Sequence, residues 1–177
     1  MRFVQRSFLG QVVNVQPCSY CSGIGYIGGN QQVVKAITKL QGQSTSCPNS
    51  IAQYAAIEAL TGDQQCVVDM KNIFLKRRDL ILSKIRTINN IECETPNGAF
   101  YIFPDFSQYL GSRDLHNNIM HSASDLCMYI LNSTGVVTVS GDSFGAPGHI
   151  RLSYATSDHT ISQAVELIKG ALSKLTF

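Results

Sequence analysis

Charged side chains are scarce in this sequence of 177 residues: Asp, Glu, Lys and Arg together make up 15% of it, against about 25% in an ordinary soluble domain. So low a fraction is expected where a partner covers part of the surface. No apolar run approaches the roughly 18 residues of a membrane-spanning helix. The longest basic run is Lys76-Arg77-Arg78, so a net charge of +2 gives a nucleic-acid partner no support. The composition therefore predicts a globular protein that binds neither a membrane nor nucleic acid.

Acidic residues are absent from the first 57 positions, where Arg2, Arg6, Lys35 and Lys39 give a balance of +4. An arginine-bearing start without acids is one feature of organelle-import sequences. The β-branched segment Val12-Val13-Asn14-Val15 favours a short strand instead, and we adopt that interpretation.

A second C-x-x-C motif is also lacking, although the sequence has six cysteines, at positions 18, 21, 47, 66, 93 and 127. Cys18 and Cys21 form the one C-x-x-C motif of the sequence. A structural zinc site would need a second pair of ligands. The spacing is scattered and no secretory signal is evident, so we expect reduced thiols, no metal site and a cytoplasmic location. A thiol redox protein using Cys18 and Cys21 is the weakest of our hypotheses.

Hydrophobic periodicity and turn residues predict helices alternating with short strands. Asn30 is the predicted N-cap of the first helix, and Pro48 is predicted in the first turn of the second. Ser157 is the predicted N-cap of the last helix. The predicted helices cover residues 31–42, 50–60, 63–88, 122–133 and 157–175, and the predicted strands cover residues 24–29, 91–94, 99–103, 136–139 and 149–155. This pattern predicts an α/β fold.

Several segments, in order along the chain, resemble segments of one enzyme family. They are Gln43–Gln53 with Ser46-Cys47-Pro48-Asn49, then Asn97-Gly98-Ala99-Phe100-Tyr101, then Ser140-Gly141-Asp142-Ser143-Phe144-Gly145 followed by Ile150-Arg151-Leu152-Ser153-Tyr154-Ala155. They are similar to segments of class I aminotransferases of the aspartate aminotransferase type, which are fold type I pyridoxal-phosphate enzymes. The resemblance covers about residues 24–177 and identifies the chain as the C-terminal portion of such an enzyme.

The resemblance implies two parts joined by a long helix. Residues 1–62 are expected to be a truncated remnant of the family's large domain, with residues 1–23 unmatched. Residues 63–177 are expected to be its complete small domain. A helix over residues 63–88 would span roughly 35–40 Å at 1.5 Å per residue, which is longer than a small domain needs.

The resemblance also implies a cofactor and a site. Family members hold pyridoxal 5′-phosphate as a Schiff base to a lysine, in a dimer, and act on amino acids and 2-oxo acids. Arg151 matches the arginine that binds the substrate α-carboxylate by two parallel hydrogen bonds. Ser46 matches a loop residue tied to cofactor binding across the dimer interface, or else serves only as a turn residue. Gly98 is expected to serve the backbone, through a close approach or a positive φ.

The family's lysine is what this sequence lacks. The family segment reads Ser-Lys, a few small residues and Gly-x-Arg-x-Gly-Tyr, and only Ile24-Gly25-Tyr26 survives of it here. Counting back places the phosphate-binding arginine at Gly23 and the lysine near Val15, yet no lysine precedes Lys35. A shortened enzyme and a changed reading frame before Ile24 both account for this. We therefore expect no catalytic residue in this chain and no retained pyridoxal phosphate.

Two hypotheses about function follow. The first is the C-terminal part of a pyridoxal-phosphate-dependent transaminase of the aspartate/2-oxoglutarate type, inactive as an isolated chain because the Schiff-base lysine region is missing. The alternative is a non-catalytic remnant or interaction module, with a homodimer surface in either case. The amino donor and acceptor stay open, and so does the question whether this chain is an enzyme at all.

Overall fold

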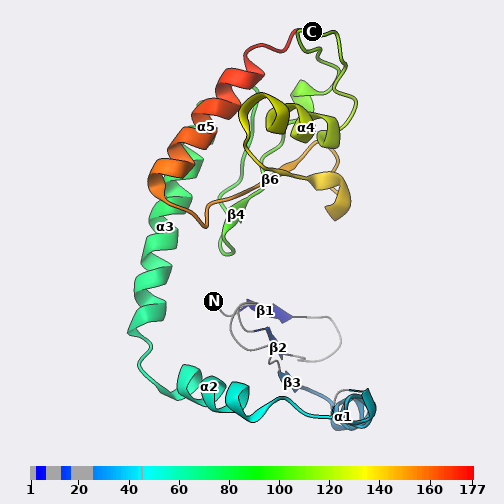
Figure 1. The fold of residues 1–177 in the computed structure, drawn as a ribbon, viewed down its shortest axis with the longest axis vertical. Helices are drawn as coiled ribbons and strands as arrows, with labels where there is room; N and C mark the ends of the chain where they lie inside the picture. Colours follow the sequence, from blue (N-terminus) through cyan, green and yellow to red (C-terminus); the bar gives the residue numbers. More distant parts are fainter. Residues whose placement is uncertain (1–2, 7–12, 17–25, 45) are drawn as a thin grey trace. The chain divides into compact units, whose positions relative to one another are not determined.

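The computed structural model describes residues 3–6, 13–16, 26–44 and 46–177. The chain divides into two compact units, Met1–Asp69 and Met70–Phe177, and Figure 1 shows the elements of each. Cys18, Cys21 and Gly23 lie outside the described residues. The assignment of the two parts to a large-domain remnant and a small domain stays a prediction.

Short antiparallel strands and two helices make up the first unit. The strands are β1 (Phe3–Arg6), β2 (Val13–Gln16) and β3 (Tyr26–Gly28), paired in the order β1-β2-β3. The helices are α1 (Gln31–Ser44) and α2 (Ser50–Thr61). The strands predicted at residues 12–15 and 24–29 are thus found as β2 and β3, and both predicted helices are confirmed.

Side-chain caps fix where these helices begin. The Asn30 side chain accepts a hydrogen bond of 2.8 Å from the Gln32 amide, as its predicted capping role requires. In α2 the prediction for Pro48 was wrong, because Asn49 is the N-cap and accepts a hydrogen bond of 2.7 Å from the Ala52 amide. Pro48 therefore precedes the helix instead of lying in its first turn.

The long helix α3 (Gln65–Ile85) begins in the first unit and continues into the second. It ends at Ile85 and not at Ile88 as predicted, because the backbone tightens there. The Thr87 amide donates to the Lys84 carbonyl and the Ile88 amide to the Ile85 carbonyl, at 3.0 and 3.1 Å. These i→i+3 bonds are typical of a helix terminus. Ile88 is nevertheless buried, as the apolar periodicity indicated.

A small antiparallel sheet lies at the centre of the second unit. It contains β4 (Tyr101–Ile102), β5 (Val139–Ser140) and β6 (Ile150–Ser153), in the order β4-β6-β5. The strand predicted at residues 91–94 is not formed; Glu92 makes only an isolated bridge to Asp105. The mixed α/β fold class is confirmed.

Two helices and two 3-10 turns complete this unit. They are α4 (Ala123–Thr134), α5 (Asp158–Leu172), η1 (Ser107–Tyr109) and η2 (Gly141–Phe144). The Ser157 side chain caps α5 as predicted, accepting from the Thr160 amide at 3.1 Å. Helix α5 runs beside the C-terminal half of α3 (Figure 1), and the ion pair Lys84–Glu166 joins the two at 3.5 Å.

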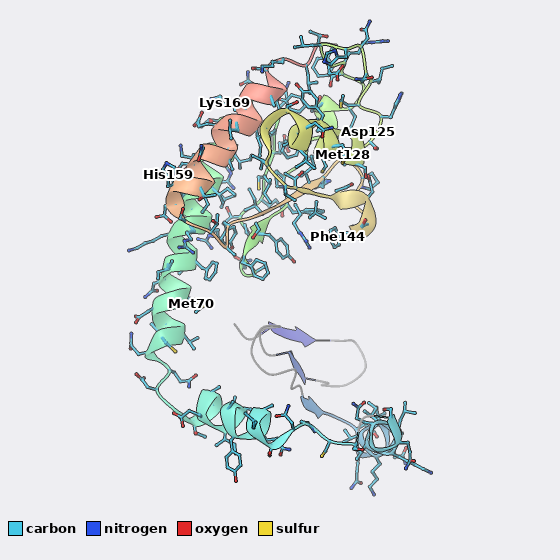
Figure 2. The ribbon with its side chains drawn as sticks, viewed as in Figure 1. Met70, Asp125, Met128, Phe144, His159 and Lys169 are labelled. Atoms are coloured by element: carbon cyan, nitrogen blue, oxygen red, sulfur yellow. The ribbon has the colours of Figure 1, made fainter. Side chains whose placement is uncertain are left out.

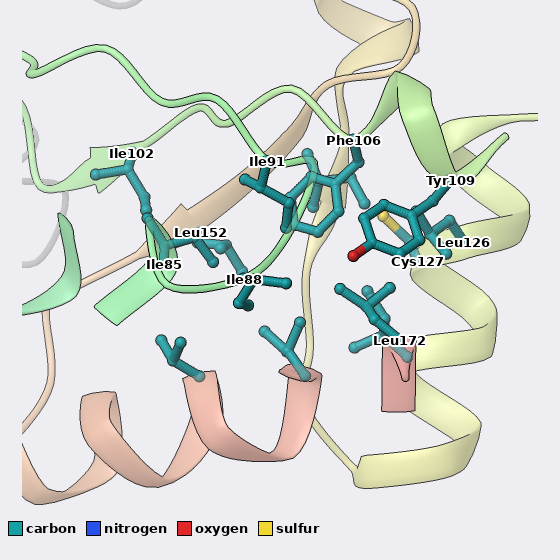
Figure 3. Close-up of a cluster of buried hydrophobic side chains, with 14 of the residues drawn as sticks. Ile85, Ile88, Ile91, Ile102, Phe106, Tyr109, Leu126, Cys127, Leu152 and Leu172 are labelled. Atoms are coloured by element: carbon teal, nitrogen blue, oxygen red, sulfur yellow. The ribbon is translucent and has the colours of Figure 1, made fainter. Parts of the chain in front are cut away.

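Packing of these helices buries one face of the sheet. Ile102 and Leu152 point into a core shared with Ile85 of α3 and Leu126 of α4 (Figure 3). Ile150 belongs to the same core. Each fully buried side chain of this size contributes roughly 1.5–3 kcal/mol. The opposite face of the sheet is left outside the core, and it carries the arginine singled out by the sequence.

Candidate functional site

Arg151 lies on β6, the central strand of the sheet in the second unit. Burial alternates along this strand: Ile150 and Leu152 are buried, Arg151 is half-buried and Ser153 is exposed. Because successive side chains of a strand point to opposite faces, Arg151 lies on the face away from the core. The core residues on either side fix the strand and leave the guanidinium accessible.

Two aromatic rings flank the Arg151 guanidinium. Its Cζ atom lies 4.9 Å from the centroid of the Phe144 ring and 5.3 Å from that of the Tyr101 ring. Both distances are within the roughly 6 Å over which a ring face attracts a cation. None of the ion pairs between described residues involves Arg151. The guanidinium is thus held by rings, which accept none of the in-plane hydrogen bonds that it can donate.

Strand pairing brings Tyr101 to this place. Tyr101 is directly opposite Ser153 across the β4–β6 pair. Ser153 is two residues from Arg151 on the same face, and long side chains of such diagonal neighbours can meet. Tyr101 had been given no role from the sequence. Tyr101 is identified as a neighbour of Arg151 by the pairing of β4 with β6, which the sequence alone does not predict.

The backbone before β4 corrects the expectation for Gly98. An added Cβ at Gly98 would meet nothing within 4 Å, and its φ is not positive, so the predicted backbone role was wrong. The left-handed residue is Ala99 instead, with a φ of 66°. Such a conformation is uncommon for a residue with a side chain.

A short turn, η2, carries Phe144. The Ser140 side chain caps it by accepting from the Asp142 amide at 3.2 Å. The hydroxyls of Ser140 and Ser124 donate to the Asp142 carboxylate at 2.7 and 3.1 Å, which ties the turn to α4. Figure 2 shows Phe144 on this turn, where its side chain is 54% exposed. The turn therefore positions an exposed ring over the arginine.

Ser46, the other predicted site residue, belongs to the first unit. It lies in the loop between α1 and α2, is exposed and has a φ of 65°. Its neighbour Cys47 is an exposed free cysteine. The roles of Ser46 and of Arg151 both stay predictions.

All seven lysines of the sequence lie among the described residues, and none is on a strand. They are Lys35 and Lys39 on α1, Lys71, Lys76 and Lys84 on α3, Lys169 on α5 and Lys174 two residues after the end of α5. Lys84 is half-buried and paired with Glu166, and the other six are exposed. Each amine is therefore either exposed or ion-paired.

The described ranges contain neither a candidate metal site nor a candidate membrane-spanning helix. Within them, no group of three or more His, Cys, Asp or Glu residues is arranged to hold a metal ion. No helix there has the length and apolar character needed to cross a membrane. Burial raises the pKa of the Cys93 and Cys127 thiols, which keeps both protonated near neutral pH.

The sequence is similar to known aminotransferases. The family model for aminotransferases of class I and II matches residues 21–168. The aspartate aminotransferase of Rhizobium meliloti (strain 1021) is 37% identical over 153 residues, which are 86% of this chain and 37% of the relative. The aspartate/prephenate aminotransferase of Nitrosomonas europaea is 42% identical over 152 residues, which are 85% of this chain and 38% of the relative. The chain thus spans little more than a third of the length of these relatives.

Solved structures agree with the sequences. The crystal structure of the Rhizobium meliloti aspartate aminotransferase matches with a TM-score of 0.83 at 36% identity, over 87% of this chain and 38% of that chain. The Thermus thermophilus aspartate aminotransferase with maleate matches with a TM-score of 0.73 at 34% identity, over 84% of this chain and 37% of that chain. The fold described above is therefore part of an aspartate aminotransferase fold. With the family model covering most of its residues, this chain belongs to the class I and II aminotransferases.

Proposed function

We propose that residues 63–177 are the C-terminal small domain of a transaminase of the aspartate/2-oxoglutarate type, and that Arg151 binds the α-carboxylate of the substrate. The family depends on pyridoxal 5′-phosphate and acts on amino acids and 2-oxo acids. Residues 1–62 would be the remnant of the large domain, with Ser46 in its loop. One observation carries the proposal, namely the guanidinium held between two rings without an ion pair among the described residues.

The chemistry of Arg151 suits a carboxylate. A guanidinium presents parallel N–H groups that match the two oxygens of a carboxylate, and it stays charged at any physiological pH. The Tyr101 and Phe144 rings restrict its movement, so less conformational entropy is lost when an acid binds. A lone, partly exposed ion pair contributes only about 0–1 kcal/mol. We therefore expect weak binding of amino acids and 2-oxo acids by this chain alone, with a Kd well above about 1 mM.

The described residues do not fit the family's cofactor. Its covalent attachment requires a lysine at a strand end in the site, whereas every lysine of this chain lies on a helix or two residues after the end of one. At the matching position near Val15 the sequence has no lysine. We propose that the chain alone does not retain pyridoxal phosphate and transfers no amino group, because both the nucleophile and the base are missing.

The second candidate function, an interaction module, is favoured by the surface of α2. Ile51, Tyr54 and Ile57 of this helix are 82%, 75% and 56% exposed. Their spacing of three residues places them on one side of the helix, and an apolar helix face is normally covered. We propose a second copy of the chain as its partner, in a homodimer. Sedimentation should then show a dimer that Tyr54→Glu dissociates, whereas a monomer at all concentrations would contradict this candidate.

Titration with maleate tests the role of Arg151. The full chain, labelled with ¹⁵N, is titrated with this dicarboxylate and followed by NMR at the arginine Nε signals. We expect the Arg151 signal to shift, and Arg151→Lys to weaken binding, since an ammonium cannot form the paired hydrogen bonds. Arg113→Lys is the matched control, because Arg113 is an exposed arginine of the same unit. Equal binding by wild type and Arg151→Lys would refute the proposed role.

A further inference from the structure

Ala99 has a backbone conformation that alanine does not favour. Its φ of 66° lies in the left-handed region, which a residue with a Cβ adopts only at a cost in free energy. Strain of this kind persists only where neighbouring structure enforces it. The residue lies two positions before Tyr101, whose ring flanks Arg151. The contacts that keep Ala99 in this conformation therefore lie at the entry to β4.

Tyr154 contacts the backbone of Ala99. Its side chain is only 2% exposed and packs in the core, with its ring centroid 6.1 Å from that of Phe74. The Tyr154 hydroxyl donates a hydrogen bond of 3.1 Å to the Ala99 carbonyl oxygen. The Tyr154 amide donates a second one of 2.8 Å to the carbonyl of Phe100. Tyr154 thus donates to two consecutive carbonyls, which directly follow the strained N–Cα bond of Ala99.

Tyr154 is connected to the surroundings of Arg151 on two sides, through β4 and through β6. Tyr101 follows Phe100 directly, and their rings meet edge-on at 5.7 Å. From the other side, Tyr154 directly follows β6, the strand that carries Arg151. If Ala99 relaxed to a negative φ, the chain entering β4 would change direction, and the Tyr101 ring would be held beside the guanidinium only by the pairing of Tyr101 with Ser153. The ring would then flank the arginine in a smaller fraction of the molecules.

We propose that Tyr154 is a positioning residue for Arg151: its hydroxyl holds Ala99 in the left-handed conformation and thereby fixes the Tyr101 ring beside the guanidinium. This inference rests on the proposed function, in which Arg151 binds a carboxylate. Tyr154 itself touches no substrate in this account. Only the fraction of molecules with Tyr101 in place would bind with full affinity, so loss of the hydroxyl should raise the apparent Kd.

The second unit supplies a matched control. Tyr109 is also buried, at 7% exposure, and its hydroxyl donates to a backbone carbonyl, that of Asn89, at 2.7 Å. This bond is in another loop, away from the Ala99 turn. Tyr109→Phe removes the same kind of hydrogen bond from the same core as Tyr154→Phe does. A general loss of stability should therefore affect both variants alike, whereas a positioning role is specific to Tyr154.

The experiment compares maleate binding by the full chain and its variants, using the Arg151 Nε signal in NMR. Tyr154→Phe should weaken binding by roughly fivefold, in the range that one hydrogen bond allows. Tyr109→Phe should bind as the wild type does. Ala99→Gly added to Tyr154→Phe should restore the affinity to within about twofold, because glycine adopts a positive φ without a tether. Wild-type affinity in Tyr154→Phe, an equal loss in Tyr109→Phe, or no rescue by Ala99→Gly would each overturn the proposal.

A second readout separates this proposal from the one on which it rests. The Cβ chemical shift and the HN–Hα coupling of Ala99 report its φ without any ligand. Tyr154→Phe should move both toward values typical of negative φ, and Tyr109→Phe should not. If the wild type binds maleate no better than Arg151→Lys, the proposed function fails, and the Ala99 signals still test the role of Tyr154. Unchanged Ala99 signals in Tyr154→Phe would refute that role by themselves.

Discussion

Replacing Gly141 by alanine probes the turn that carries Phe144 over Arg151. Gly141 is buried at the start of η2, where the chain folds back on itself. Its amide donates to the His149 carbonyl at 2.7 Å, and its own carbonyl accepts from the Ala146 amide at 3.1 Å. These two bonds close the loop between β5 and β6. A side chain at Gly141 would have to enter the space that they enclose.

The cost follows from the atoms that the new Cβ would meet. It would lie 2.7 Å from the His149 carbonyl oxygen and 3.0 Å from the His149 Cβ, and it would overlap the Ala146 carbonyl oxygen. Overpacking of this kind costs about 1–3 kcal/mol. Carbonyls fixed in the loop cannot rotate away as a flexible side chain does, so we expect about 3 kcal/mol. In a domain of about 100 residues this lowers the unfolding midpoint by roughly 10–20 °C.

Thermal unfolding of the full chain, followed by circular dichroism, measures this loss. Gly98→Ala is the matched control, because a Cβ there meets nothing within 4 Å and the φ of Gly98 is not positive. The control should change the free energy of unfolding by less than about 0.5 kcal/mol. A midpoint for Gly141→Ala within about 2 °C of the control would show that the loop yields, and would refute the reasoning.

Ser122→Ala removes the capping box that Ser122 forms with Asp125 at the start of α4. The free energy of unfolding, measured in urea, should therefore fall by about 1 kcal/mol. An unchanged value would contradict the capping role. Burial raises the pKa of Tyr109, Tyr129 and Tyr154 above the usual value of about 10. Above that pH the unfolded chain loses protons that the folded chain keeps, so the urea midpoint should fall as the pH rises above about 10, and a constant midpoint would contradict this.

The helices could be predicted from the sequence because local signals specify them. Apolar periodicity placed α1, α2, α3, α4 and α5, and the caps Asn30 and Ser157 form as expected. The strands were less predictable, since their extent depends on pairing between distant residues. The segment at 91–94 makes a single bridge, and β4 begins only at Tyr101 because Ala99 is left-handed.

The site was predictable only in part. Arg151 was found through its resemblance to a family motif, and the alternation of burial along β6 is consistent with an arginine on the outer face. The flanking rings of Tyr101 and Phe144 come from a cross-strand diagonal and from a turn held by Asp142. Neither contact has a local signature, because each joins segments far apart in the sequence. A positive φ was one of two roles predicted for Gly98, but the left-handed residue is Ala99, whose carbonyl oxygen accepts a hydrogen bond from the buried Tyr154 side chain.

The central claim is that this chain has the family's carboxylate-binding arginine but no amine placed to hold the cofactor. Its most direct test is to incubate the full chain with pyridoxal phosphate, reduce the adduct with borohydride and map the labelled lysines by mass spectrometry. Amino-group transfer from aspartate to 2-oxoglutarate is assayed in parallel. We expect only partial labelling, spread over the exposed lysines such as Lys35, Lys71 and Lys174, and no turnover above that of the cofactor alone. Complete labelling of a single lysine, together with turnover that Arg151→Ala abolishes, would contradict the account.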